Sequence, residues 1–274
     1  MKLSYIKQVS LLLRVLPEVL KIESFALHGG TAINLFHHNM PRLSVDIDIT
    51  YIPFGIVVSA PSLQKEEYKL LCQLGNSVVK IEVNTTNRGI IAPVELLPLS
   101  MLAQDTFNQF VEARMVPKSQ LFGGKMVAAL DRQHPRDIFD MHQFISKNGQ
   151  LIDIKSGLLF CLLSSNRPIH ELLSPNFLNQ RQAFENQFSG MSDALFTYNQ
   201  FEETRLLLVK EVKNLFSDQD KSFLINFMIS NPDMANYPFL NYPAIEWKRK
   251  NIDLLRKKNP AKFDKLIKQT ELLF

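Results

Sequence analysis

The sequence predicts an α/β (α+β) fold, with a mixed-sheet domain over residues 1–148 and a helical bundle domain over residues 149–274. This prediction rests on a change of hydrophobic period near residue 150. Before this point, short apolar or alternating runs typical of strands are interspersed with helical segments. After Gly149 only helical periods follow, separated by Ser-Asn, Ser-Pro and Asn-Pro breaks.

An amphipathic helix over residues 9–20 is expected to come first and to cover the sheet. Ser10, Arg14, Pro17 and Glu18 interrupt its apolar run, so it is neither a signal peptide nor a membrane span. Strands are expected around Phe25 and over 45–51, 56–59, 78–84 and 90–96. Helices of the second domain are expected over 151–163, 175–188, 198–216, 218–229 and 244–274.

The composition favours a cytoplasmic globular protein. Of its 274 residues 46% are hydrophobic, so the chain can bury a large core. Its two cysteines, Cys72 and Cys161, form neither a disulfide framework nor a zinc-binding spacing, which indicates a reducing compartment. A three-histidine zinc site is not expected, because His37 and His38 are adjacent on a predicted helix and cannot share one face.

A short apolar strand leads into paired glycines. The run from Phe25 ends in His28, Gly29 and Gly30, and a helix is expected to start at Thr31. Glycines let the backbone approach a ligand closely, and the free N–H groups of the helix start favour an anion such as triphosphate. His28, directly before the glycines, is placed to contact the phosphate groups of such an anion or a second substrate that accepts a group from it. The simpler interpretation of this pattern is an ordinary turn.

Two carboxylates follow at the spacing of a strand. Apolar and acidic side chains alternate here, which places Asp46 and Asp48 on one strand face with Cα atoms roughly 6.7 Å apart. Carboxylates so placed can share Mg²⁺. A third acid, Glu82, lies with Lys80 on the polar face of another alternating strand. The alternative interpretation is a solvated strand face on which Lys80 and Glu82 are surface charges.

A cationic helix edge and a second pair of acids lie further along the chain. Lys125 and Arg132 are seven residues apart and therefore share one helix face. Pro135 suits the start of a new helix, on which Asp137 and Asp140 share a face. The bend between these helices would bring the acids near the bases. The alternative is a salt-bridged amphipathic helix that binds no ligand.

Together these segments resemble a known family. The order strand, Gly-Gly-Thr, helix, then Arg42, Ser44, Asp46 and Asp48 in an Arg-x-Ser-x-Asp-x-Asp run resembles the nucleotidyltransferase superfamily. More narrowly, it is similar to the first motif of the AbiEii/AbiGii toxins of type IV toxin–antitoxin systems. The later Lys, Arg, Arg-Asp and Asp pattern is similar to the same family. This chain departs from many nucleotidyltransferases in carrying Gly30 where they carry Ser.

The resemblance implies a nucleotidyltransferase fold and an enzyme that transfers a nucleoside monophosphate from an NTP and releases pyrophosphate, with Mg²⁺ or Mn²⁺ as cofactor. The implied catalytic residues are Asp46, Asp48, Glu82, Lys125 and Asp137. The first three would bind the metal; Glu82 would also help to deprotonate the acceptor, and Asp137 would position Lys125 or orient the acceptor. The implied nucleotide contacts are Gly29, Gly30, Thr31, Arg42, Ser44 and Lys125.

The resemblance leaves Arg132, Arg136 and Asp140 as structural residues that form ion pairs between helices. It also implies a cognate antitoxin and an association with phage defence. Some family members resemble enzymes that add nucleotides to the 3′ end of tRNA, which makes tRNA the first candidate for the acceptor.

A basic segment over residues 245–268 indicates a polyanionic partner. It carries nine basic and three acidic side chains, on a chain whose formal net charge is only +4. This local excess favours RNA as the acceptor, whereas the alternative is a solvated helical face. Apolar side chains are expected to anchor the segment so that its charges face outward. The expected anchors are Trp247, Ile252, Leu254, Leu255 and Phe263.

Two other classes of function would share these residues. A small-molecule nucleotidyltransferase acting on an antibiotic or metabolite would differ in its acceptor pocket, and the basic segment favours RNA over it. A non-catalytic nucleotide- or RNA-binding protein on the same fold would bind without metal-dependent turnover. The sequence contains no Gly-x-x-x-x-Gly-Lys-Ser/Thr or Gly-x-Ser-x-Gly motif and no cysteine–histidine nucleophile pattern.

Overall fold

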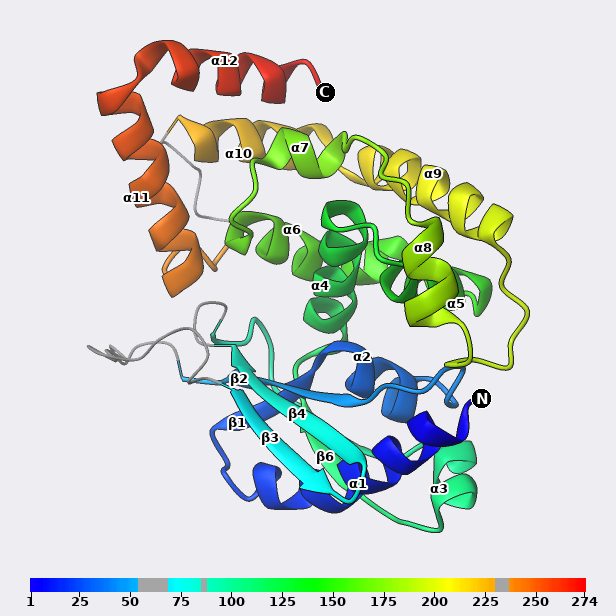
Figure 1. Cartoon of the computed structure of the whole chain (residues 1–274). Coiled ribbons are helices and arrows are strands. Elements are labelled where there is room, and N and C mark those ends of the chain that lie inside the picture. Colours follow the sequence, from blue (N-terminus) through cyan, green and yellow to red (C-terminus); the bar gives the residue numbers. More distant parts are fainter. Residues whose placement is uncertain (54–68, 85–87, 230–236) are drawn as a thin grey trace.

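The structure, a computed structural model, describes residues 1–53, 69–84, 88–229 and 237–274. Figure 1 shows a sheet in the lower half of the molecule and a group of helices above it that includes the C-terminus. This is the mixed α/β architecture that the sequence predicts. The strand expected over 56–59 lies outside the described residues. None of the described helices is both long and apolar enough to span a membrane.

The described strands form a six-stranded sheet in the order β3-β4-β2-β1-β6-β5. Their bounds are β1 Phe25–His28, β2 Asp46–Tyr51, β3 Lys69–Leu74, β4 Ser77–Asn84, β5 Glu95–Pro98 and β6 Glu112–Met115. β1 is antiparallel to β2 and parallel to β6, while β2 is parallel to β4. The strand that carries the paired acids and the strand that leads into the glycines therefore lie side by side in the middle of the sheet.

Strand alternation separates the core from the acids. Helix α1 (Leu3–Leu20) packs against one face of the sheet, as predicted. In β2, Ile47 and Ile49 are buried in the apolar core. Asp46 and Asp48 point to the opposite face, where they border a cavity. The local pattern of this strand thus directs both carboxylates towards the helical half.

The sequence pattern misses β3 and β6, and it predicts β5 too early. β3 is an edge strand with exposed leucines, and β6 alternates charged with apolar residues over only four positions. The strand predicted over 90–96 begins only at Glu95. The backbone before Glu95 forms hydrogen bonds with the side chain of Gln120 instead of with a strand. This side chain accepts from Ile91 N (3.1 Å) and donates to Gly89 O (3.1 Å). Pro93 also lacks the N–H that a strand ladder needs.

Helices between the strands and up to residue 146 have the following bounds: α2 Gly29–Thr31, continued by a π-helix Ala32–His37, α3 Met101–Phe107, α4 Lys118–Asp131 and α5 Pro135–Ser146. The later ones are a 3₁₀ turn Leu151–Ile154, α6 Lys155–Ser164, α7 Ile169–Leu173, α8 Arg181–Ala183 with a π-helix Phe184–Phe188, α9 Tyr198–Leu215, α10 Asp218–Met228, α11 Pro243–Lys258 and α12 Pro260–Glu271. The predicted helix over 244–274 is divided at Asn259, whose side chain caps α12.

The helix predicted over 175–188 is wrong in its first half, because α8 begins only at Arg181. Buried Gln133 donates to Asn176 O (2.8 Å) and accepts from Leu178 N (3.0 Å). These tertiary hydrogen bonds occupy backbone groups that a helix would pair internally.

Helices α4 and α6 cross at close range. Gly123 on α4 faces Gly157 on α6, and a Cβ atom on either would collide with the backbone of the other helix. Both glycines are therefore required for the crossing. The domain boundary at residue 148 stays a prediction; in the structure α4 and α5 pack together, and α4 also packs against α6 in the helical half (Figure 1).

Lys248 on α11 is buried, which corrects the prediction that the whole basic segment faces outward. Its side chain is 6% exposed, and Nζ donates to Leu162 O (2.9 Å) and Arg167 O (2.9 Å). Burial lowers the pKa of Lys248 to about 7. The carbonyl of Leu162 is one of the last in α6 and has no partner within that helix, so the ammonium group completes the end of α6.

The expected apolar anchors of this segment are only partly correct. Ile252 and Phe263 are buried, and Leu255 packs against the core. Trp247 and Leu254 are instead 52% and 46% exposed. Their side chains therefore lie on the outer face of α11, together with most of its charges.

We expect the free energy of unfolding to depend on pH through Lys248. Its folded pKa is about 7 and that of an unfolded lysine about 10.4, so between these values the unfolded chain binds more protons. Stability should therefore rise with pH above 7, by at most about 1.4 kcal/mol per pH unit, and Lys248→Met should lack this rise. Unfolding curves of both proteins across this pH range test it; parallel profiles would contradict the role of burial.

Candidate functional site

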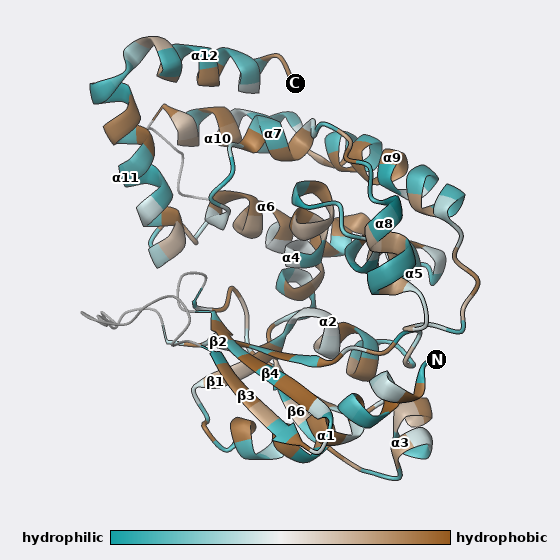
Figure 2. Ribbon diagram, in the orientation of Figure 1, coloured by the Kyte–Doolittle hydropathy of each residue, from teal (hydrophilic) through white to brown (hydrophobic). Residues whose placement is uncertain are grey.

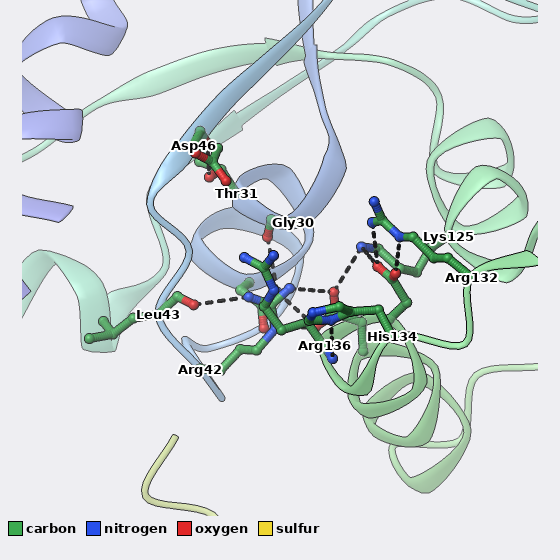
Figure 3. Close-up of polar contacts among 12 residues, drawn as sticks. Gly30, Thr31, Arg42, Leu43, Asp46, Lys125, Arg132, His134 and Arg136 are labelled. Atoms are coloured by element: carbon green, nitrogen blue, oxygen red, sulfur yellow. Dashed lines mark hydrogen bonds and ion pairs between the residues drawn. The ribbon is translucent and has the colours of Figure 1, made fainter. Parts of the chain in front are cut away.

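A cavity of about 590 Å³ lies between the sheet and helices α4, α5 and α6, within the size range of small-molecule sites. Charged side chains from β2, β4, α4 and α5 border it. In Figure 3, Asp46 lies on the strand side and Lys125, Arg132 and Arg136 lie towards the helices. All the predicted site residues except Thr31 thus come together around one space.

The three predicted acids lie on neighbouring strands. Asp48 is the register partner of Glu82 in the parallel β2–β4 pair, and Asp46 is the partner of Lys80. Burial, together with repulsion from Asp48, raises the pKa of Asp46. Hydrogen bonds from Lys80 and then Lys69 lower the pKa of Glu82, outweighing its partial burial. The acids are therefore adjacent, but their surroundings differ.

The side chains of Asp46 and Asp48 provide two carboxylate ligands that suit Mg²⁺. Mg²⁺ is commonly held by one or two carboxylates together with water and substrate phosphates, which matches Asp46 and Asp48. Glu82 pairs with Lys69 (3.1 Å) and Lys80 (2.6 Å). Within the described ranges there is no cluster of three or more His, Cys, Asp or Glu side chains that could hold a metal. A third ligand from Glu82 would require it to leave these lysines.

The two glycines leave room for the acids and their neighbours. Gly29 has φ +74°, and a Cβ atom there would collide with the Asp48 carboxylate. A Cβ atom on Gly30 would lie 2.8 Å from Ser44 Oγ and 2.9 Å from Arg42 Nη2. The helix begins at Gly29 rather than at Thr31, where the sequence predicts it. The Gly-Gly pair therefore serves the packing of the site in addition to any ligand contact.

Thr31 and Arg42 are engaged within the protein. Thr31 is fully buried and its hydroxyl donates to Asp46 O (2.5 Å). Arg42 is 2% exposed and donates to both carboxylate oxygens of Asp140 (2.7 and 2.6 Å) and to Leu43 O (2.9 Å). Ser44 borders the cavity. Thr31 and Arg42 thus hold the backbone at Asp46 and just before it.

Lys125 lies between two buried carboxylates. Its Nζ is 2.7 Å from Asp137 Oδ1 and 3.1 Å from Asp140 Oδ2. Asp137 also accepts from Arg132, at 2.5 and 3.1 Å. Burial favours a neutral Asp137, but Lys125 and Arg132 outweigh it and hold its pKa below the ordinary range. This contact agrees with the expectation that Asp137 positions Lys125.

Asp140 connects the sheet half with the helical half. It is fully buried, accepts hydrogen bonds from Arg42 and Asn34 Nδ2 (3.0 Å), and forms an ion pair with Lys125 (3.1 Å). These partners come from the loop before β2, from α4 and from the π-helix after the glycines. The predicted structural role of Asp140 and Arg132 in ion pairs between helices agrees with these contacts.

Arg136 differs from the prediction that it forms an ion pair. It borders the cavity, and its guanidinium group has no hydrogen bond or ion pair with any residue that the structure describes. The sequence itself indicated that Arg136 would not share the ion pairs of Asp137. Adjacent helical residues point to different faces, so an arginine next to inward-facing Asp137 cannot share its partners. Arg136 is therefore a cation facing the cavity that is left available for a ligand.

This arrangement, with paired strand carboxylates beside a Gly-Gly turn and a lysine–aspartate pair across the cavity, brings together the two motifs by which the sequence resembles a nucleotidyltransferase. A family model described as "Nucleotidyl transferase AbiEii toxin, Type IV TA system" matches residues 10–69 and 57–251. The chain therefore belongs to this family of nucleotidyltransferase toxins and is an enzyme of that class.

A solved structure has a similar fold. It is "MenT4, nucleotidyltransferase toxin Rv2826c from Mycobacterium tuberculosis H37Rv", with a TM-score of 0.57 and 13% sequence identity over 91% of this chain and 90% of that one. No curated protein matches the chain significantly.

Lys125→Met and Arg136→Met remove equal charge but should differ in stability. Without Lys125, buried Asp137 and Asp140 lose a shared cation, which we expect to cost about 3 kcal/mol because Arg132 and Arg42 remain. Arg136→Met leaves no described partner unpaired and should stay within about 0.5 kcal/mol of wild type. Urea unfolding measures both; equal losses would contradict these pairings.

Proposed function

We propose that this enzyme transfers a nucleoside monophosphate from an NTP to an RNA acceptor, tRNA being the first candidate, in a Mg²⁺-dependent reaction that releases pyrophosphate. The observation that carries the proposal is the pair Asp46 and Asp48 on β2, with Glu82 beside Asp48 and Lys125 bordering the same cavity. Phosphoryl transfer depends mainly on positioning and charge stabilisation, and these side chains provide both.

The donor NTP would be held by residues from both halves of the cavity. Mg²⁺, or Mn²⁺, on Asp46 and Asp48 would offset the negative charge of the triphosphate. Backbone N–H groups at Gly29 and Gly30 and the Lys125 ammonium group would contact phosphate oxygens. We add Arg136 to this set, because its guanidinium group has no partner among the described residues and suits phosphate geometry. Ser44 would contact the nucleotide from the rim.

The transfer step forms one bond and breaks one. The acceptor hydroxyl oxygen attacks the α-phosphorus, the bond from this phosphorus to the bridging oxygen of the β-phosphate breaks, and pyrophosphate leaves. Glu82 would accept the hydroxyl proton as the nearby carboxylate base. Its hydrogen bonds from Lys80 and Lys69 lower its pKa and weaken it as a base, so this role requires Glu82 to leave both lysines. Asp137 holds Lys125, while Thr31 and Arg42 act by fixing the backbone around Asp46 rather than by touching the nucleotide.

An RNA acceptor is supported by the charges of α11 and α12. Lys257, Lys258 and Lys262 are exposed, in contrast to Lys248. Figure 2 shows hydrophilic residues along both helices. We also propose a cytoplasmic location, which agrees with the free thiols of Cys72 and Cys161. The proposal further includes a cognate antitoxin and a role in phage defence.

Asp46→Asn and Asp48→Asn should each lower nucleotide transfer by about 10²–10³-fold, the range found for loss of one electrostatic stabiliser. Folding should be retained, because burial and mutual repulsion already disfavour a charged Asp46. The assay combines the purified protein, each labelled NTP, Mg²⁺ and total RNA, with thermal unfolding as the control. Normal transfer by both folded variants would refute the metal assignment.

The salt dependence of RNA binding tests the acceptor surface. Each phosphate contact contributes about 0.7 to the log–log slope for single strands, so Lys257→Gln/Lys258→Gln/Lys262→Gln should flatten it by about 2. NTP affinity should stay unchanged. A charge-matched control replaces Lys7, Lys147 and Lys210, which are exposed on other elements. Equal slopes for both triple variants would favour a small-molecule acceptor, because such a ligand would not contact an extended helical face.

A further inference from the structure

The cavity has an apolar end as well as a charged one. Besides the acids and cations, it is bordered by apolar or uncharged residues from the first half of α4, from the C-terminal half of α6 and from the residue that follows β6. These residues are Val116, Leu121, Gly124, Phe160 and Cys161. The charged end accounts for a triphosphate, but it does not explain why the cavity continues along this wall.

Gly124 has no role in helix packing. Its neighbour Gly123 is essential, because a Cβ atom there would collide with the backbone of Gly157. At Gly124 a Cβ atom would meet only Cys161 Sγ, at an ordinary contact distance of 3.6 Å. Glycine also weakens a helix interior relative to alanine. The missing side chain therefore leaves open space in the cavity, directly beside Lys125.

The wall around this space is packed against the protein interior, and the polar groups of Gln120, Cys161 and Ser164 already have partners. Phe160 is held by edge contacts with Phe239 and Tyr242. Both ends of the Gln120 amide bond to backbone groups, Cys161 Sγ donates to Gln120 O (3.7 Å) and Ser164 Oγ donates to Phe160 O (2.8 Å). Such a wall suits a flat ring that binds by van der Waals contact.

The exposed side of the cavity lies elsewhere. Asn166 and Arg167 border it and are exposed. A macromolecular acceptor must enter from such an open rim, whereas Leu121 and Phe160 are buried and Cys161 is half-buried, with the pKa of its thiol raised by burial to about 12. A small donor molecule fits this apolar end better than the terminus of an RNA.

We propose that the nucleoside of the donor NTP occupies this apolar end, with its base against Gly124 and Cys161 and its triphosphate running past Lys125 towards Asp46 and Asp48. The inference rests on the proposed function and assigns the nucleoside subsite of the same cavity. Gly124 is then a specificity-determining position, because any side chain there takes space from the base.

Gly124→Val should separate the nucleoside from the phosphates. We would measure the affinity of the wild type and the variant for each Mg²⁺–NTP and for Mg²⁺–tripolyphosphate, which has the charge but no nucleoside. The wild type should bind at least one NTP roughly tenfold more tightly than tripolyphosphate, in line with the contribution of one packed base. The variant should lose this preference, bind tripolyphosphate as before, and unfold at the same or a higher temperature.

Two controls keep the outcomes distinct. Gly123→Ala, on the same helix, should lower stability, because its Cβ atom would collide with the backbone of α6. Cys161→Leu narrows the proposed base site from α6 and replaces Gly124→Val in the binding test if that variant does not fold. Unchanged NTP affinity in these cavity variants, or an equal loss for tripolyphosphate, would overturn the nucleoside subsite while leaving the proposed function in place. If the wild type binds neither NTP nor tripolyphosphate, the proposed function itself fails, and the subsite with it.

Discussion

Two buried carboxylates on α5 fix the cavity wall: Asp137 joins α5 to α4, and Asp140 joins α5 to the sheet half as well. Each would be costly to bury alone, and each is neutralised by cations from other elements: Lys125 and Arg132 for Asp137, and Arg42 and Lys125 for Asp140. Because Lys125 serves both, its ammonium group is fixed at the cavity wall before any ligand arrives. The contacts that stabilise the fold therefore also preorganise the site.

The position of the paired acids depends on the close approach of β2 to the start of α2. The absence of a side chain at Gly29 lets Asp48 lie against the start of α2, and Thr31 ties the same helix to the backbone of Asp46. Since β2 is paired with both β1 and β4, the acids cannot shift without disturbing the sheet. Cations around the cavity thus divide into paired ones, which build it, and Arg136, which has no described partner and faces the ligand space.

Several features could be predicted because they depend on neighbours in sequence. The alternation around Asp46 and Asp48 places both on one strand face, and the paired glycines mark the end of β1. Pro135 marks the first turn of α5, on which Asp137 and Asp140 share a face. The family motifs added the expectation that these two distant segments meet, which periodicity alone does not provide.

The sequence by itself determined the fold class, the strand face of the acids and the pairing of α4 with α5, because period and turn chemistry act over a few residues. Only the tertiary structure decided that Lys248 is buried while Trp247 is exposed, and that residues 176–178 bond to Gln133 instead of forming a helix. Each of these outcomes depends on groups far apart in the chain, whose meeting is set by the packing of whole elements rather than by local preference.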